Sequence, residues 1–348
     1  MIRNVIRILN PYEAGNSAKR LKKGYIVLCS NENPYPPHPA VIDAIKQELG
    51  KVNRYPDPEY RELKVAIAEY LGVEVDQIAV GNGASEILGN ICTAVLDVMD
   101  AVTIPIPSYT MYAILAMLRD ASLNFVEYPY YRIDSEDLIE KAGQSKLMFL
   151  CSPNNPTGNT IENLEYILSN FNGLVVLDEA YAEFSKENAI KLIDDYDNIV
   201  IVRTLSKFFG LAGLRIGYAV SKNLELIEAL EKIRLPFCIN NIAVRAAMAA
   251  LENVEYYRRI RDKIVEEREK LVKELERFEQ LEVFPSQANF LLVRVKDEIG
   301  LAKRLEEKGI AVRDVSGLMG LKGEHVRITI GREEENRTLV EALKLILK

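Results

Sequence analysis

The stretch Thr204-Leu-Ser206-Lys207-Phe-Phe-Gly210-Leu-Ala-Gly213-Leu-Arg215 follows a β-branched apolar run at residues 199–202. Two apolar runs further upstream also end in polar residues. One is followed by Pro153-Asn-Asn155-Pro-Thr-Gly158, and the other by Asp178-Glu-Ala-Tyr181. Because open α/β sheets bind ligands at the carboxyl ends of their strands, the three segments predict one shared site. An amide, a carboxylate with a phenol, and an amine with a guanidinium would meet there.

These groups match what pyridoxal 5′-phosphate requires. Lys207 can hold the aldehyde as a Schiff base, since desolvation or cationic neighbours lower the pKa of a lysine. Asp178 can keep the pyridine nitrogen protonated, which makes the ring an electron sink. Asn155 and Tyr181 carry suitable hydrogen-bonding groups for the ring's phenolate oxygen.

The 5′-phosphate requires a guanidinium, hydroxyl groups and free backbone amides at a helix N-terminus. Arg215, Ser206 and Thr204 lie beside the lysine and supply the first two. The turn Gly81-Asn-Gly83-Ala-Ser85-Glu86 leads from a strand-like run into a helical pattern and predicts the amides. A dinucleotide-binding turn would have a third glycine where Glu86 stands, so we set nicotinamide cofactors aside.

With these segments in place, the chain resembles the fold-type I, class II pyridoxal-phosphate enzymes, in the histidinol-phosphate aminotransferase branch. The resemblance covers nearly the whole chain. Its motifs occur in the family's order, namely residues 9–15, Ser30-Asn-Glu-Asn33-Pro-Tyr35, Arg54-Tyr55-Pro-Asp57, residues 81–86, Pro107-Ser-Tyr109, Asn155-Pro-Thr-Gly158, residues 178–181, Ser206-Lys207, Ala288-Asn289-Phe290 and Val326-Arg327-Ile-Thr-Ile-Gly331.

The resemblance implies further contacts to the cofactor. Tyr109 would stack on the ring, and the turn at Gly83, Ala84 and Ser85 would give backbone amides to the phosphate. Tyr55 would reach the phosphate of the cofactor in a partner subunit. The resemblance therefore implies a homodimer.

The resemblance also implies contacts to the substrate. Arg327 would clamp the anionic group on Cα, and a bidentate guanidinium suits a carboxylate or a phosphate. Arg313 is a second candidate for an anion contact. Asn33 and Tyr12 are further substrate-binding candidates from the N-terminal arm.

The implied reaction is transfer of the amino group from L-histidinol phosphate to 2-oxoglutarate in histidine biosynthesis. Lys207 would be the Schiff-base lysine and the general base, assisted by Asp178 and Tyr181. One alternative is the threonine-phosphate decarboxylase of cobalamin synthesis, which residues 54–58, 81–86 and 313–321 also resemble. Others are an aromatic or broad-specificity aminotransferase and a non-catalytic, pyridoxal-binding regulatory module.

Composition excludes several other classes of function. The 348 residues include 44 Lys and Arg against 51 Asp and Glu, with no extended basic run, so we expect no nucleic-acid partner. The only histidines are His38 and His325, which we expect at the surface or in loops, so we predict no metal site. Four scattered cysteines fit a reduced compartment, and no stretch approaches a membrane-spanning length. We expect a soluble, cytoplasmic protein without a membrane partner.

Alternating strand-like and helical runs predict an α/β fold of type I. Residues 1–38 are expected to form an arm that packs with the small domain and the partner subunit. Residues 39–250 would form the large cofactor-binding domain, with a mostly parallel sheet of the seven-stranded type covered by helices. Residues 251–348 would form a smaller α+β domain, beginning with a charged, solvated helix.

Overall fold

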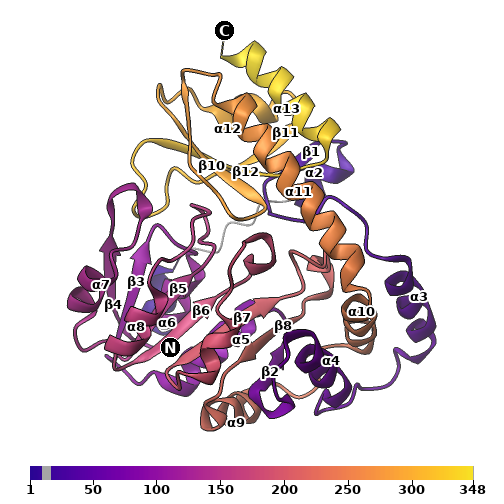
Figure 1. Ribbon diagram of the computed structural model, residues 1–348, viewed down its shortest axis with the longest axis vertical. Coiled ribbons are helices and arrows are strands. Elements are labelled where there is room, and N and C mark those ends of the chain that lie inside the picture. The colour runs from indigo at the N-terminus through magenta and orange to yellow at the C-terminus, as the bar shows by residue number, and fades with distance from the viewer. Residues whose placement is uncertain (10–16, 348) are drawn as a thin grey trace.

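The computed structural model describes residues 1–9 and 17–347, which form two sheets stacked along the long axis of the molecule (Figure 1). The larger sheet has the strand order β2-β8-β7-β6-β5-β3-β4. Its strands are β2 (Ile78–Gly81), β3 (Ala101–Ile106), β4 (Ser122–Glu127), β5 (Leu147–Cys151), β6 (Leu174–Asp178), β7 (Ile199–Thr204) and β8 (Gly217–Val220).

The larger sheet is mostly parallel. Strands β3 to β7 run in one direction, whereas β8 is antiparallel to both of its neighbours, β7 and β2. The link from β7 to β8 contains only the short 3-10 helix Ala212–Leu214, so the chain turns back without the crossover helix that a parallel pair requires. That link carries Lys207, which places the lysine at the carboxyl end of the parallel strands.

Helices cover the larger sheet on both faces, which explains why β5 and β7 are apolar and completely buried (Figure 1). The helices of this part are α3 (Pro39–Glu48), α4 (Arg61–Leu71), α5 (Ala84–Val95), α6 (Met111–Met117), α7 (Ser135–Ala142), α8 (Leu164–Asn170), α9 (Leu224–Ile233) and α10 (Asn241–Glu252). The N-terminal residues form α1 (Asn4–Ile8) and α2 (Ser17–Lys22).

The smaller sheet has the order β1-β11-β12-β10-β9. Its strands are β1 (Ile26–Leu28), β9 (Leu281–Val283), β10 (Phe290–Val295), β11 (Ile310–Asp314) and β12 (Glu324–Thr329), and its helices are α11 (Val254–Leu275), α12 (Leu301–Glu306) and α13 (Glu333–Ile346). Strand β1 pairs in parallel with β11, with Ile26 opposite Ile310. An N-terminal strand therefore completes a sheet that is otherwise C-terminal.

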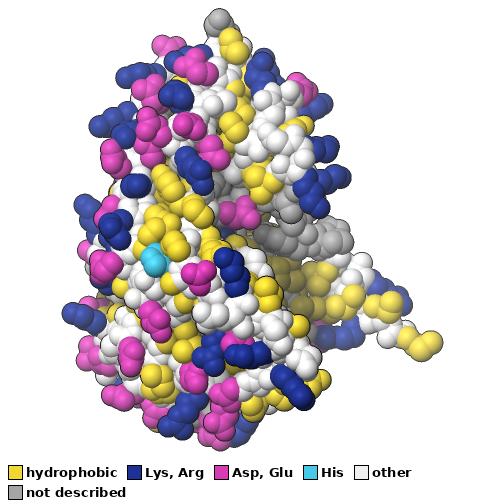
Figure 2. All heavy atoms as spheres, turned by 90° about the vertical axis from the view of Figure 1, so that its right-hand side faces the viewer, with side chains coloured by type: hydrophobic (Ala, Val, Ile, Leu, Met, Phe, Trp, Pro, Cys, Tyr) yellow, Lys and Arg dark blue, Asp and Glu magenta, His cyan; other side chains and the backbone are white. Residues whose placement is uncertain are grey.

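The predicted fold class is confirmed, and the domain boundaries at 38/39 and 250/251 stay predictions. The charged helix α11 was expected to be solvated, and its outer side carries ion pairs such as Lys270 with Glu266 at 2.8 Å. Its inner side is buried and includes Glu267 and Arg268. Figure 2 shows Lys, Arg, Asp and Glu interspersed over one face of the molecule.

One expectation about the histidines was wrong. His325 is completely buried within β12, where its Nε2 lies 3.3 Å from the hydroxyl oxygen of Tyr131. His325 shares one face of β12 with Arg327 and Thr329, and it is buried because β12 is covered on both faces. Among the described residues, no helix is long and apolar enough to cross a membrane.

Candidate active site

A cavity of about 280 Å³ opens at the carboxyl ends of β5, β6 and β7, below the small sheet. It brings together most of the predicted site residues, namely Ala84, Ser85, Tyr109, Asn155, Asp178, Tyr181, Thr204, Ser206, Lys207, Arg215, Arg313 and Arg327. Residues from eight separate segments thus converge, and those that follow β5, β6 and β7 meet because parallel strands end at one edge of the sheet.

One end of the cavity is built to hold an anion. Helical hydrogen bonding in α5 begins with the amides of Glu86 and Ile87 onto Gly83, which leaves the amides of Ala84 and Ser85 at the helix end. Gly83 has φ of 85°, and a Cβ atom there would collide with the Arg215 guanidinium. The turn therefore requires glycine so that the guanidinium can lie against it.

The hydroxyls at this end are ordered by one another. The Thr204 hydroxyl lies 2.9 Å from the Ser206 hydroxyl and 3.0 Å from the Ile216 carbonyl oxygen. Arg215 donates to the Ser206 hydroxyl at 3.4 Å. Two hydroxyls, a guanidinium and helix-end amides therefore face one spot, which is the donor set that binds a phosphate.

Lys207 lies at the centre of the cavity. Its amine donates to the Ser30 carbonyl oxygen at 3.0 Å and lies 5.8 Å from the centre of the Tyr181 ring. Burial, together with the positive charges of Arg327 and Arg215, lowers the pKa of Lys207 to about 8, against the opposing effects of Glu32 and Asp178. A lysine in this state provides a nucleophilic amine near neutral pH.

Asp178 ends β6 and is buried beside the lysine. Its carboxylate accepts hydrogen bonds from the Tyr112 hydroxyl at 2.6 Å and from the Ala180 amide at 3.0 Å, both neutral donors. Burial raises the pKa of Asp178, while the Tyr112 hydrogen bond opposes that rise. A buried carboxylate with neutral partners is stabilised when a cation such as a protonated ring nitrogen lies beside it.

The two predicted donors to a ring oxygen are held in place by other polar groups. The Asn155 side-chain oxygen accepts a hydrogen bond from Arg327 at 2.6 Å, which leaves the amide hydrogens of Asn155 for the cavity. The Tyr181 hydroxyl accepts a hydrogen bond from the Asn31 amide at 3.0 Å.

Two arginines form the opposite end of the cavity. Arg313 on β11 and Arg327 on β12 are direct partners in the antiparallel register, and both line the cavity. Like charges that face each other across a strand pair are destabilising unless an anion lies between or near them. This end of the cavity is therefore suited to a second anionic group, apart from the phosphate site at α5.

The comparisons with known proteins agree with this geometry. Residues 23–343 match the family Aminotransferase class I and II. Histidinol-phosphate aminotransferase 2 of Archaeoglobus fulgidus is 48% identical over 355 residues, which cover 99% of this chain and 100% of that protein. The chain belongs to the histidinol-phosphate aminotransferase family.

Solved structures also resemble this family member. The histidinol-phosphate aminotransferase from Sinorhizobium meliloti in complex with pyridoxal-5′-phosphate is 30% identical, with a TM-score of 0.88 and coverage of 99% of this chain and 97% of that one. L-threonine-O-3-phosphate decarboxylase from Porphyromonas gingivalis is 26% identical, with a TM-score of 0.81 and coverage of 92% and 99%.

Three described residues that were predicted for the site do not line the cavity of this aminotransferase. Gly83 is the N-cap of α5 behind the phosphate end. The Asn33 amide donates to the Phe208 carbonyl oxygen at 3.0 Å, so Asn33 braces the loop after Lys207. Tyr55 is 79% exposed and stacks on Phe237 at 4.4 Å. Tyr12 lies outside the described residues.

Three other residues at the site of the aminotransferase were not assigned a role from the sequence. Tyr112 is fully buried and holds Asp178, and it lies three positions after Tyr109 at the start of α6. Glu32 lines the cavity. Asn31 holds Tyr181. Asn31 and Glu32 belong to the motif from which only Asn33 was selected, so the motif was the available signal.

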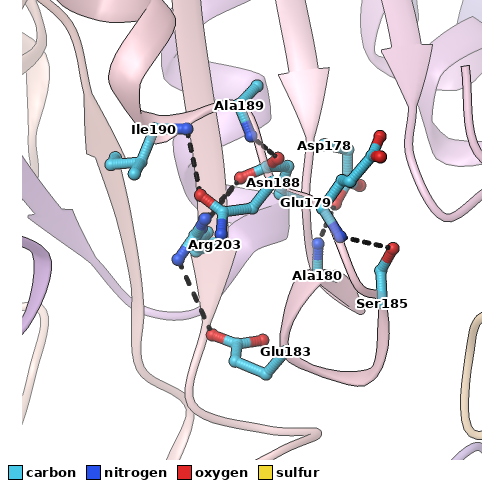
Figure 3. Close-up of polar contacts among 10 residues, drawn as sticks. Asp178, Glu179, Ala180, Glu183, Ser185, Asn188, Ala189, Ile190 and Arg203 are labelled. Carbon is cyan, nitrogen blue, oxygen red and sulfur yellow. Dashed lines mark hydrogen bonds and ion pairs between the residues drawn. The ribbon is translucent and has the colours of Figure 1, made fainter. Parts of the chain in front are cut away.

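A buried ion pair lies next to the site and joins the ends of β6 and β7 (Figure 3). Arg203, one residue before Thr204, donates two hydrogen bonds to Glu179, one residue after Asp178, at 2.9 and 2.7 Å. Glu183 lies 4.0 Å from the same guanidinium, and burial raises the pKa of Glu183. This cluster locks the ends of β6 and β7 to each other in the aminotransferase.

Proposed function

We propose that this protein transfers the amino group of L-histidinol phosphate to a 2-oxo acid, 2-oxoglutarate being the expected acceptor, with pyridoxal 5′-phosphate as its cofactor. The observation that carries the proposal is the cavity in which Lys207 lies between an anion site at α5 and a second anion site at Arg313 and Arg327. One anion site suits the cofactor's phosphate, and the other suits the substrate.

The residues of the cavity fit the cofactor. Arg215, Ser206, Thr204 and the amides of α5 would hold its phosphate. Asp178 would pair with the ring nitrogen, and Asn155 with Tyr181 would donate to the ring oxygen. When bound, pyridoxal phosphate supplies an electron-accepting ring and a carbon that receives the amino group.

Lys207 is the proposed proton carrier. With the cofactor and substrate bound, the amine of Lys207 would lie within the same cavity as the substrate Cα. Because the pKa of Lys207 is about 8, a useful fraction of the amine is neutral near pH 7 to 8 and can accept the Cα proton.

Arg327 is the proposed clamp for the substrate's anionic group, with Arg313 as its neighbour. Histidinol phosphate has a phosphorylated methylene where glutamate has its α-carboxylate. One guanidinium can bind either group in a bidentate manner, so one site would serve both half-reactions. Arg327 is already oriented by its hydrogen bonds to Asn155 and to the Cys29 carbonyl oxygen.

We further propose that the active unit is a homodimer in which Tyr55 of each chain completes the other chain's phosphate site. Tyr55 is highly exposed and stacks on Phe237, in a region where Leu49, Val52 and Leu235 are also exposed. Exposed apolar groups of this extent mark interaction surfaces. The proposed cytoplasmic location rests on the biosynthetic role alone.

The deciding experiment uses protein loaded with pyridoxal phosphate and given L-histidinol phosphate without an acceptor. We expect the visible absorbance of the cofactor to change to that of pyridoxamine phosphate and to return on adding 2-oxoglutarate. A Lys207→Ala protein should show neither change. The paired arginines would also suit a substrate with two anionic groups, so release of carbon dioxide from O-phosphothreonine without transamination would instead indicate the decarboxylase.

A further inference from the structure

Asn31 is the centre of a buried hydrogen-bond network beside the cofactor site. Asn31, Thr329, Asn289 and Tyr181 are each at most 5% exposed. The backbone N–H of Asn31 donates to the Thr329 hydroxyl at 2.9 Å, and the backbone carbonyl oxygen of Asn31 accepts a hydrogen bond from the Asn289 side chain at 3.2 Å. Asn31 has φ of 52°, a left-handed conformation that asparagine tolerates better than most residues.

The orientation of the Asn31 side chain follows from its partners. The Thr329 hydroxyl already accepts the Asn31 backbone hydrogen, so its own hydrogen is free to point at the Asn31 side-chain oxygen, 3.2 Å away. The side-chain nitrogen of Asn31 then faces the Tyr181 hydroxyl at 3.0 Å. In the reverse orientation the Thr329 hydrogen would have no acceptor among these groups.

This orientation has a consequence for Tyr181. An amide nitrogen can only donate, so the Tyr181 oxygen is the acceptor of the Asn31 hydrogen bond. The single hydrogen of the Tyr181 hydroxyl is then left for a different acceptor. Tyr181 lines the cavity, and so its hydrogen is available to a group bound there.

We propose that Asn31 is a positioning residue that directs the Tyr181 hydroxyl hydrogen toward the phenolate oxygen of the bound cofactor. Thr329 sets the polarity of Asn31, and Thr329 lies two residues after Arg327 on β12. The small sheet thus positions the Tyr181 hydroxyl, which donates to the cofactor, as well as Arg327, which would bind the substrate's anionic group. The inference rests on the proposed cofactor and goes beyond the proposed reaction.

Asn31→Asp is the sharpest test because a carboxylate of the same shape can only accept. It would take the Tyr181 hydrogen away from the cofactor. A ring oxygen that has lost a hydrogen-bond donor holds the proton that it shares with the Schiff-base nitrogen more tightly. The pH midpoint of the cofactor's visible absorbance change should therefore rise. We expect a rise of about one pH unit, which corresponds to the free energy of one hydrogen bond to a charged oxygen. We expect Tyr181→Phe to raise the midpoint by a similar amount.

Two further variants separate the hydrogen bond from the added charge. In a Tyr181→Phe background, Asn31→Asp should shift the midpoint by less than about 0.3 pH unit, because the hydroxyl it redirects is gone. Thr329→Val adds no charge and should also raise the midpoint, because it releases the Asn31 amide. Asn198→Asp is the matched control, since the Asn198 amide bonds the Leu168 and Phe171 carbonyl oxygens at the far end of β7, and it should leave the midpoint unchanged.

The inference is overturned if Asn31→Asp and Thr329→Val both bind the cofactor with the wild-type midpoint. It is also overturned if the Asn31→Asp shift persists in full without the Tyr181 hydroxyl, since the charge alone would then act. Failure of the proposed function is distinguishable. If the protein did not bind the cofactor, the wild type would show no absorbance to titrate, and if it bound the cofactor but did not transfer the amino group, the titration of the variants would still be readable.

Discussion

Arg313 and Arg327 lie directly opposite each other on adjacent antiparallel strands, and both face the cavity. An anionic group bound at this pair would contact two guanidinium groups, each of which can donate in a bidentate manner. The smaller sheet therefore carries the binding site for the substrate's anionic group, while the larger sheet carries the residues that would hold the cofactor.

Replacing Arg327 by alanine should lower kcat/KM for both half-reactions by about a hundredfold or more, because a desolvated charge contact to the substrate is lost. Arg313→Ala should cost less, roughly tenfold, as the second contact. Single-turnover kinetics with histidinol phosphate and with 2-oxoglutarate would measure both effects. Arg294→Ala is a matched control, since Arg294 on β10 pairs with Glu282 at the surface. Loss of the cofactor from Arg327→Ala without a change in substrate affinity would contradict the assignment.

Lys207→Met should stabilise the cofactor-free protein at pH 7. The pKa of Lys207 is lowered from 10.5 to about 8 on folding, so below pH 8 the folded state carries a penalty for the buried ammonium. Between about pH 8 and 10.5 the unfolded chain binds more protons, so wild-type stability rises with pH across this window. The gain from Lys207→Met should be up to about 3 kcal/mol below pH 8 and shrink toward pH 10.5.

Urea unfolding of the cofactor-free proteins at several pH values would measure this gain. Lys232→Met is the control, because Lys232 is exposed and paired with Glu228 on α9. If wild type and Lys207→Met were equally stable at pH 7, burial of the charged lysine would not destabilise the folded protein, and the prediction would be wrong.

Tyr112→Phe should destabilise the protein by about 1 to 3 kcal/mol, because a buried carboxylate loses a 2.6 Å hydrogen bond. The same change should raise the pKa of Asp178 further, since this hydrogen bond lowers it. Cofactor binding should restore part of the lost stability by placing a cation beside Asp178. Thermal unfolding with and without pyridoxal phosphate checks both statements, and an unchanged midpoint in the cofactor-free protein would refute the first.

Arg203→Met should cost about 3 to 5 kcal/mol of unfolding free energy, because it leaves Glu179 buried without its partner. Arg203 does not line the cavity, so the substitution should reduce the free energy of unfolding more than it reduces substrate affinity. The double variant Arg203→Met with Glu179→Met should recover most of the loss. A double variant as unstable as the single one would mean that the pair contributes through packing.

The core of the site was predictable because it depends on local signals. Lys207, Asp178 and Asn155 each follow an apolar strand, and a parallel sheet necessarily gathers such strand ends. Arg327 was identified through the family resemblance and lies on β12. These residues are fixed by secondary structure and by strand order.

The residues that were missed depend on contacts between distant segments. Asn31 and Asn33 stand in the same motif, and nothing local distinguishes them, yet the left-handed backbone at Asn31 turns only its amide toward Tyr181. Strand β1 is three residues long and is stabilised by β11 rather than by its own sequence pattern. Burial of His325 likewise follows from the pairing of β12 with β10 and β11.

The pairing of Ile26 with Ile310 also bears on how a ribosome delivers this protein. The first strand of the small sheet leaves the ribosome 284 positions before its partner, a wait of roughly 15 to 60 s at ordinary rates of synthesis. Asn31 follows β1 closely and depends on Thr329, so it waits as well. A nascent chain can complete its larger sheet early, but the hydrogen-bond network around Tyr181 cannot form until translation is almost finished.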